Sequence, residues 1–363
     1  MKITFKILIL TALLNIMLIS CQNKMKEKEY NWSAAVCTPK NYPAEIFSGH
    51  LKFNDKPNSG YVYMPFDDII NSYDLGDNDG SSSGEATGIV PKILDITWMS
   101  YVENKSYSGI FQLDSDKIEA LMKNGSVTPF WDVETKKVNT FKDYLFVINA
   151  GLFPGGMVVL YVWSPINTTI VGRYQAHEDK NVDWKAAREQ MEDNSEMDKD
   201  VADLVSRLPQ EIKDQIKNGT IPFGYWETLF RKYPITPTVM AEDKVETIEI
   251  DYINGEFESI FLSLNGNVMP IRERAVPRKI NIVWHDVNDR RMESDIFFDE
   301  KKSKAIFENL KAGEGIKFVF EIDRNTKPRE TKGIAIKLKT ASSEIDMKEA
   351  IVSQESFTKP TPY

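Results

Sequence analysis

The sequence predicts an α+β, β-rich protein in which two repeated hairpin–helix–hairpin modules, built on antiparallel sheets, flank a helical insert. Three observations lead to this fold class. Short apolar runs separated by Gly, Pro and Asn fill residues 31–175 and 238–350, which is typical of strands and turns. Between them, residues 182–207 are charged and carry apolar side chains at helical spacing. The two strand-rich parts also resemble each other in sequence, which indicates a repeat.

The repeat is clearest where residues 91–98 align with residues 277–284, each segment running from a proline to a tryptophan. The offset is 284 − 98 = 186 residues. We therefore expect each copy to form a hairpin, a helix and a second hairpin. The alternative is two similar β-modules without a common origin. Two further matches are residues 110–111 with 296–297 at the same offset, and residues 121–125 with 309–313 after a two-residue insertion.

The N-terminal module is expected to span residues 31–175. Asn124 and Gly125 should end its helix, because glycine adopts the left-handed conformation that stops helices. The predicted elements are strands at residues 45–53 and 61–64, a hairpin of residues 93–101 and 109–113, a helix at residues 115–123, and a second hairpin of residues 144–149 and 157–163.

The helical insert is expected to span residues 176–237, where Pro234 and Pro237 should close it. The C-terminal module should follow over residues 238–350, and residues 351–363 should form a tail. The predicted helices of the insert are residues 182–207, 210–217 and 223–231, and the closing hairpin of the second module is residues 316–322 and 333–338.

The N-terminus resembles the signal of a bacterial lipoprotein. A short basic region precedes the apolar residues 7–19, which are too few to span a bilayer comfortably. Leu18, Ile19 and Ser20 then lead into Cys21, as in the lipobox of these proteins. We therefore expect residues 1–20 to be a signal peptide and Cys21 to be the lipidated first residue of the mature protein. The alternative is an uncleaved signal anchor.

Lipidation of Cys21 would hold the chain on a lipid bilayer, because each buried methylene of an acyl chain contributes about 0.8 kcal/mol. Residues 21–30 are polar and rich in lysine, so they should form a flexible tether. Residue 22 is Gln and not the Asp that retains many lipoproteins at the inner membrane. We therefore expect a cell-envelope protein anchored in the outer membrane and facing the periplasm.

The acidic composition argues against nucleic acid as a partner. The net charge is −9, and removal of residues 1–20 takes away Lys2 and Lys6 but no acid, which gives −9 − 2 = −11. Nucleic-acid binding instead depends on Lys and Arg that neutralise phosphates. The chain has two cysteines, so lipidation of Cys21 would leave Cys37 without another thiol to pair with. We therefore expect no intrachain disulfide.

The short motifs that resemble catalytic or metal sites lack their usual context. Residues 80–84 match G-x-S-x-G, but neither a buried strand nor a helix flanks them. Residues 77–80 resemble part of a calcium loop, yet Leu75 and Ala86 occupy two positions where acids are needed. The three histidines show no metal-ligand spacing; they are His50, His177 and His285.

We therefore predict a protein that is not an enzyme, with no catalytic residue, no metal site and no cofactor. Residues 151–156 are glycine-rich, but no Gly-Lys-Ser/Thr follows, so they are predicted to form a tight turn and not a phosphate site. The enzymatic alternative is a periplasmic hydrolase that uses an unrecognised carboxylate pair or the loop around Ser82.

Four segments, in order, resemble the DUF2931 family of bacterial envelope lipoproteins, which has no established activity. The resemblance is clear from about residue 31 to residue 184 and looser in the C-terminal copy. Cys37 and Thr38 stand where small residues are expected. The segments are residues 37–43 with Pro39, Lys40, Tyr42 and Pro43, residues 98–103 with Trp98, residues 151–159 with Pro154, Gly155 and Gly156, and residues 172–176 with Gly172 and Arg173.

The motif residues have structural interpretations. Pro39 and Pro43 should hold an extended segment, and Trp98 should pack in the core. Arg173 should pair with a carboxylate, either within the chain or on a partner. The resemblance also implies, from the gene context of some relatives, an immunity role against effectors of type VI secretion.

From these observations we expect a membrane-anchored binding protein whose partner is a toxin or an envelope protein. One form of this function is an immunity protein that neutralises a secreted type VI toxin. The first alternative is the periplasmic hydrolase described above. The second is a structural subunit of an envelope complex.

Overall fold

The structure is a computed structural model that describes residues 28–56, 60–65, 69–72, 75–76, 86–132, 135, 137–182, 194–240, 245–262, 269–325, 333–348 and 350–356. The predicted signal peptide, Cys21, most of the tether and the residues of the 77–84 motifs lie outside these ranges. The prediction of a β-rich α+β fold is confirmed, because strands in antiparallel sheets dominate and helices are few.

The N-terminal module consists of two five-stranded layers that enclose one hydrophobic core. One layer has the strand order β12–β6–β5–β2–β3, and the other has the order β4–β1–β9–β10–β11. The elements are β1 (Tyr30–Cys37), β2 (Ala44–Lys52), β3 (Tyr61–Tyr63), β4 (Ala86–Gly88), β5 (Ile93–Ser100), β6 (Lys105–Gln112), α2 (Ser115–Asn124), β7 (Ser126–Asp132), β8 (Lys137–Asp143), β9 (Phe146–Leu152), the short 3-10 turn η1 (Pro154–Gly156), β10 (Met157–Ser164), β11 (Asn167–Gln175) and β12 (His177–Glu178).

The C-terminal module repeats this strand order. Its layers run β22–β18–β17–β14–β15 and β16–β13–β19–β20–β21, so each strand has a counterpart in the first module. The repeat includes the parallel pair, which is β1 with β9 in one module and β13 with β19 in the other. The elements are β13 (Tyr233–Met240), β14 (Val245–Tyr252), β15 (Phe257–Phe261), β16 (Arg272–Arg274), β17 (Pro277–His285), β18 (Arg291–Phe297), α8 (Glu300–Glu308), β19 (Ile316–Ile322), β20 (Ile334–Lys339), β21 (Glu344–Asp346) and β22 (Ile351–Ser356).

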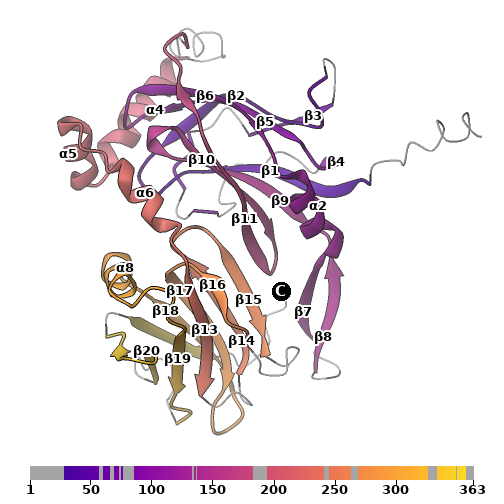
Figure 1. The fold of residues 1–363 in the computed structure, drawn as a ribbon, viewed down its shortest axis with the longest axis vertical. Coiled ribbons are helices and arrows are strands. Elements are labelled where there is room, and N and C mark those ends of the chain that lie inside the picture. The colour runs from indigo at the N-terminus through magenta and orange to yellow at the C-terminus, as the bar shows by residue number, and fades with distance from the viewer. Residues whose placement is uncertain are drawn as a thin grey trace, which may run out of the picture.

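The two modules share one ten-stranded sheet, which forms where β11 of the first module pairs with β15 of the second. The helices of the insert, α4 (Asn194–Arg207), α5 (Gln210–Asn218) and α6 (Phe223–Leu229), lie to one side of the junction between the modules (Figure 1). Side chains of β10 are buried on both faces: Val158 and Leu160 enter the first core, and Val159 and Tyr161 enter the second. The junction is therefore part of a hydrophobic core and not a hinge.

The tryptophans of the sequence repeat occupy equivalent buried positions. Trp98 pairs with Tyr107 across the β5–β6 hairpin, and Trp284 pairs with Met292 across the β17–β18 hairpin. The β-strand partner of each tryptophan also has a bulge directly after it, at Ile46 in β2 and at Val245 in β14.

Beyond the tryptophans, the predicted alignment is wrong by one residue. Trp98 lies nine residues before its cross-strand partner Tyr107, but Trp284 lies eight residues before its partner Met292. The connection between these paired positions is therefore one residue shorter in the second module. The buried Ile296 is therefore equivalent to Phe111, while the exposed Ile110 corresponds to Asp295. The alignment failed because an apolar dipeptide gives no information about which residue faces inward.

The predicted two-residue insertion before the helix end is also wrong. Both helices begin two residues after their hairpins, and each is capped by an aspartate: Asp114 accepts the N–H of Lys117, and Asp299 accepts the N–H of Lys302. The buried Met122 of α2 then corresponds to Phe307 of α8. Gly125 directly follows α2, as predicted, and has a positive φ of 66°, but its ψ of 174° is extended and not left-handed helical.

Three further elements differ from the sequence-based expectation. Residues 351–356 of the predicted tail form β22, because they complete an edge of the ten-stranded sheet by pairing with β18. The hairpin of β7 and β8 was not predicted, because its alternating pattern is short and interrupted by Pro129. Pro234 and Pro237 lie inside β13 and do not close the helical block. Beyond Ile235 the strand β13 has no partner on its β16 side within the described residues, and such an edge tolerates proline.

No helix within the described ranges is long and apolar enough to cross a membrane.

Candidate functional site

Tyr42, from the first motif segment, lies against the helical insert. Its hydroxyl donates to Oε1 of Gln215 in α5 at 2.7 Å, and its ring meets the ring of Trp226 in α6 edge to face, with centroids 4.8 Å apart. Burial raises the pKa of Tyr42 to about 12, so the hydroxyl remains a donor at neutral pH. The preceding turn closes when the N–H of Tyr42 donates to the carbonyl of Pro39 at 3.0 Å.

Glu103, from the second segment, contacts the third segment, and Gln175 of the fourth segment contacts the same turn. Its carboxylate accepts the N–H of Gly155 at 2.9 Å and the hydroxyl of Tyr107 at 2.7 Å. Gln175 donates from Nε2 to the carbonyl of Gly155 at 2.8 Å. Both backbone polar groups of Gly155 are thus bound by side chains from elsewhere in the chain. Gly155 and Gly156 have φ angles of 82° and 85°, a region that favours glycine.

The fourth segment contacts α6 directly. Arg173 pairs with Glu227 at 2.9 Å, and its guanidinium lies 5.0 Å from the ring centre of Phe230. Of the two partners expected for Arg173, the carboxylate is therefore one within the chain. Because both charged groups are largely exposed, the ion pair contributes only about 0–1 kcal/mol. At the start of α6, the ring of Phe223 lies 2.9 Å from where a Cβ on Gly155 would stand.

The remaining motif residues support these contacts. Trp98 is fully buried and stacks on the ring of Tyr107. The carbonyl of Pro43 accepts the N–H of Tyr101 at 3.1 Å, which joins the first segment to the second. Pro154 is buried in the turn η1, Gly172 faces Leu160 beside a β-bulge, and Lys40 is exposed.

Beside these contacts lies a cavity of about 460 Å³, which we call the junction cavity. Of the four motif segments, only the first lines it, through Pro39, Lys40, Asn41 and Tyr42. Its volume lies within the range of small-molecule sites, and such sites often form between domains. Both modules and the insert contribute to the walls. Six residues define it: Lys40 and Tyr42 from the first module, Gln215 and Trp226 from the insert, and Arg278 and Glu300 from the second module.

The wall of the junction cavity combines aromatic rings with charges of both signs. The hydroxyl of Tyr225 donates to Glu300, and burial together with this bond raises the pKa of Tyr225 well above its ordinary value. Burial lowers the pKa of the Arg278 guanidinium, which shows that this cation is poorly hydrated. The indole N–H of Trp226 is buried and has no acceptor among the described residues. The lining is therefore better suited to an apolar or aromatic group than to a purely cationic or purely anionic one.

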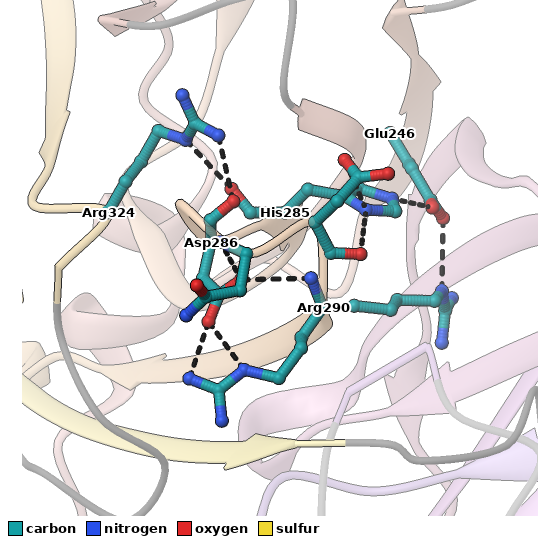
Figure 2. Close-up of polar contacts among 8 residues, drawn as sticks. Glu246, His285, Asp286, Arg290 and Arg324 are labelled. Atoms are coloured by element: carbon teal, nitrogen blue, oxygen red, sulfur yellow. Dashed lines mark hydrogen bonds and ion pairs between the residues drawn. The ribbon is translucent and has the colours of Figure 1, made fainter.

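A second polar cluster lies at the β17–β18 turn (Figure 2). His285 Nε2 lies 2.6 Å from Glu246, and Arg291 bonds the other oxygen of that carboxylate at 3.1 Å. The bond to Glu246 raises the pKa of His285. Although burial opposes it, the bonds from His285 and Arg291 lower the pKa of Glu246.

Both ring nitrogens of His285 already have partners, because Nδ1 lies 3.3 Å from the carbonyl of Asp289. On the other side of the turn, Asp286 binds the guanidinium of Arg290, and Arg324 donates to the carbonyls of His285 and Asp286 at 2.9 and 2.8 Å (Figure 2). This cluster therefore holds two turns together and presents no vacant base.

The other residues considered from the sequence do not form a site. Cys37 is buried, and its sulfur accepts the N–H of Gly76 at 3.4 Å. His50 packs against the rings of Tyr61 and Tyr63, and His177 is exposed on β12. Within the described ranges, no three His, Cys, Asp or Glu residues gather as metal ligands. Cys21 and Ser82 lie outside those ranges.

Sequence reasoning missed Gln215, Trp226, Arg278 and Glu300, although all four line the junction cavity. The run Phe223–Leu229 contains three aromatic residues in a short helix, and this density was the available signal. Nothing in the local sequence indicates that residue 42 meets residue 215.

Comparison with known families gives one match. The family model described as "Protein of unknown function (DUF2931)" matches residues 20–224, which is more than half of the chain. No curated protein and no solved structure matches. The matched range contains all four motif segments and ends within α6, so it includes the walls of the junction cavity from the first module and most of those from the insert.

Proposed function

The chain belongs to the DUF2931 family, and from its geometry we propose that it is a lipid-anchored envelope protein that binds a partner through the junction cavity. The observation that carries this proposal is the convergence of the four motif segments. Tyr42, Glu103, Gly155 and Arg173 come from separate segments, yet each contacts α5, α6 or the turn packed beside them. A function that depends on these residues would therefore act where the motif segments meet α5 and α6.

The proposed partner inserts an apolar or aromatic group into the junction cavity. The rings of Tyr42 and Trp226 supply flat apolar surface, and burying such a group releases water at about 25 cal/mol per Å² of apolar area. Lys40 lies exposed at this site, where it can contact a polar part of the same partner. The net charge of −9 would steer a basic protein partner toward the chain.

A lipid anchor at Cys21 would place this site in the periplasm. The support is the lipobox-like sequence before Cys21 and the polar residues that follow it. Replacement of Cys21 with Ser should block acylation and leave a longer precursor that keeps residues 1–20. An acylated product of normal length from the Cys21→Ser variant would contradict the anchor.

An immunity protein against a secreted toxin is one form of this proposal, with the toxin as the partner. The hydrolase alternative would need a nucleophile or a carboxylate pair at a cleft, and the described walls of the junction cavity offer Glu211 and Glu300, each already bonded to Lys301 or Tyr225. A structural subunit would instead migrate in a large detergent-stable complex of fixed composition.

Co-purification from envelope extracts tests the binding proposal. Lys40→Glu reverses a charge at the cavity, and Lys317→Glu reverses one on the exposed face of β19 as a matched control. A protein retained by the wild type and by Lys317→Glu, but lost from Lys40→Glu, supports the proposed site. Equal retention by all three forms would show that binding occurs elsewhere.

A further inference from the structure

The β7–β8 hairpin is an addition to the repeated fold. In the first module, residues 125–145 connect α2 to β9 and contain this hairpin. In the second module, only residues 309–315 connect α8 to β19. The strands β7 and β8 form a separate two-stranded sheet that joins no other strand within the described ranges. Figure 1 shows the hairpin projecting from α2, away from both sandwiches.

The surface of this hairpin is unusually apolar. Five apolar residues of the hairpin and its exit are between 39% and 47% exposed: Val127, Phe130, Phe141, Tyr144 and Leu145. The rings of Phe130 and Phe141 lie on one face, 5.9 Å apart. A two-stranded hairpin is only marginally stable by itself in water, and exposed apolar residues of this density usually mark an interaction surface.

The hairpin lies on the side of the molecule where the chain enters β1 (Figure 1). Tyr30, at the start of β1, donates its hydroxyl to Glu119 in the middle of α2, and the hairpin follows directly after that helix. The strand β3, which contains the exposed Tyr61 and Tyr63, lies on the same side of the view.

The distance to the predicted anchor is short. Tyr30 lies nine positions after Cys21, and extended chain spans at most about 3.3–3.6 Å per residue, so β1 begins within about 32 Å of the lipid. The seven-residue strands of the hairpin are each about 23 Å long, at about 3.3 Å per residue. The hairpin can therefore reach the bilayer while the tether is only partly extended.

Charge and edge chemistry favour lipid over a protein strand as the occupant. Residues 125–145 contain three lysines and three acids, so the hairpin is neutral in a chain whose net charge is −9. It therefore avoids the repulsion that the rest of the chain meets at an anionic membrane. Pro129 in β7 and the lysines of β8 are the residues that proteins use to block strand addition at an open edge.

We propose that the β7–β8 hairpin is a second membrane contact, in which Phe130 and Phe141 on one face of the hairpin, together with Tyr144 and Leu145 at its exit, enter the boundary between headgroups and acyl chains. This proposal rests on the lipid anchor of the proposed function. Aromatic side chains favour this boundary, and a surface-bound segment buries its apolar face about 5–10 Å deep there. Together with the tether, the contact fixes which face of the molecule points away from the membrane.

Depth-dependent quenching of a fluorescent label tests the contact. The acylated full chain is reconstituted into phosphatidylethanolamine–phosphatidylglycerol vesicles, with an environment-sensitive thiol label at Phe141→Cys. The matched control carries the label at Ile110→Cys, which is 69% exposed on β6 and outside the hairpin. Cys37 is fully buried and Cys21 would be acylated, so the label is specific.

The label at residue 141 should lose emission when brominated lipids are added, most strongly with bromines close to the headgroups, and the label at residue 110 should not. Vesicle-bound protein in which residue 141 is unquenched overturns the hairpin contact alone. An emission shift without quenching would mean that a second copy of the chain covers the hairpin, which also overturns it. Failure of the acylated chain to float with the vesicles overturns the anchor itself, and the hairpin contact with it.

Discussion

The two modules share their strand order but connect their two sheets in different ways. In the first module, the carboxylate of Glu103 in the β5–β6 turn accepts the N–H of Gly155 in the β9–β10 turn. In the second module, Arg324, which follows β19, donates to the carbonyls of His285 and Asp286 at the β17–β18 turn. Equivalent turns therefore meet in both modules, but the side chain is an acceptor in one and a donor in the other.

The two closures also differ in what they contact outside their own module. The Arg324 cluster is closed within the second module, where Asp286 and Arg290 complete it (Figure 2). The Glu103 contact instead holds the Pro154-Gly155-Gly156 turn, and that turn packs against Phe223 at the start of α6. The same topological position is thus closed within one module and, in the other, contacts α6, the helix that supplies Trp226 to the junction cavity.

Among the substitutions that test the comparison of the two modules, Gly156→Ala should cause the largest loss of unfolding free energy. A Cβ there would lie 2.7 Å from the ring of Tyr107 and 2.9 Å from the carbonyl of Ala176, in addition to the unfavourable φ of 85°. We expect a loss of about 2–4 kcal/mol in the free energy of unfolding, measured by urea denaturation. The matched control is Gly313→Ala, which has a φ of 73° but an open environment and should lose only about 1–2 kcal/mol. Equal losses would show that the turn after β9 is not tightly packed.

Ser294→Ala sharpens the comparison between the two buried tryptophans. The indole N–H of Trp284 donates to Ser294 at 2.9 Å, whereas that of Trp98 has no acceptor among the described residues. Loss of the hydroxyl leaves a buried donor unsatisfied, so Ser294→Ala should cost about 1–3 kcal/mol of unfolding free energy. The exposed Ser353→Ala control should be close to neutral. A neutral Ser294→Ala would mean that the bond contributes nothing in the second module.

The smallest expected effect concerns the stability that two histidines contribute, which should depend on pH in opposite directions. It is measured from the unfolding midpoints of the wild type, His285→Gln and His50→Gln between about pH 5.5 and 8.5. The bond to Glu246 raises the pKa of His285 above 6.5, so its stabilisation is complete below pH 6.5 and is lost as the pH rises through the folded pKa. Burial lowers the pKa of His50, so protonation of His50 destabilises the fold as the pH falls below 6.5. The advantage of wild type over His285→Gln should therefore shrink with rising pH, and its advantage over His50→Gln should grow. A parallel response of the two variants would contradict these opposite environments.

Much of the fold could be predicted because local patterns determine it. Trp98 and Trp284 marked the repeat, and Gly125 marked the end of α2. The parallel pairing of β1 with β9 could not be predicted, since any of several apolar runs satisfies the same burial pattern. The one-residue shift before Ile296 failed for a related reason, because turn length is set by backbone geometry and not by apolar residues.

The junction cavity was even less accessible from the sequence. Tyr42 and Gln215 are 173 residues apart in the sequence and meet only in the tertiary structure. The motif residues were recognisable, but their common contact with α5 and α6 is a property of the tertiary structure. The wall of the cavity also includes Arg278 and Glu300, which lie in the second module, where the family resemblance is looser.

We propose that this chain binds its partner through the junction cavity and not through the exposed face of β19 in the second module. The most direct measurement places a photocrosslinking amino acid at Lys40 or at Lys317 in living cells and compares the products. The proposal predicts a discrete adduct from residue 40 that disappears when Trp226 is replaced with Arg in the same chain, and no such adduct from residue 317. An adduct from residue 317 alone, or one from residue 40 that Trp226→Arg leaves unchanged while the chain remains folded, would contradict it.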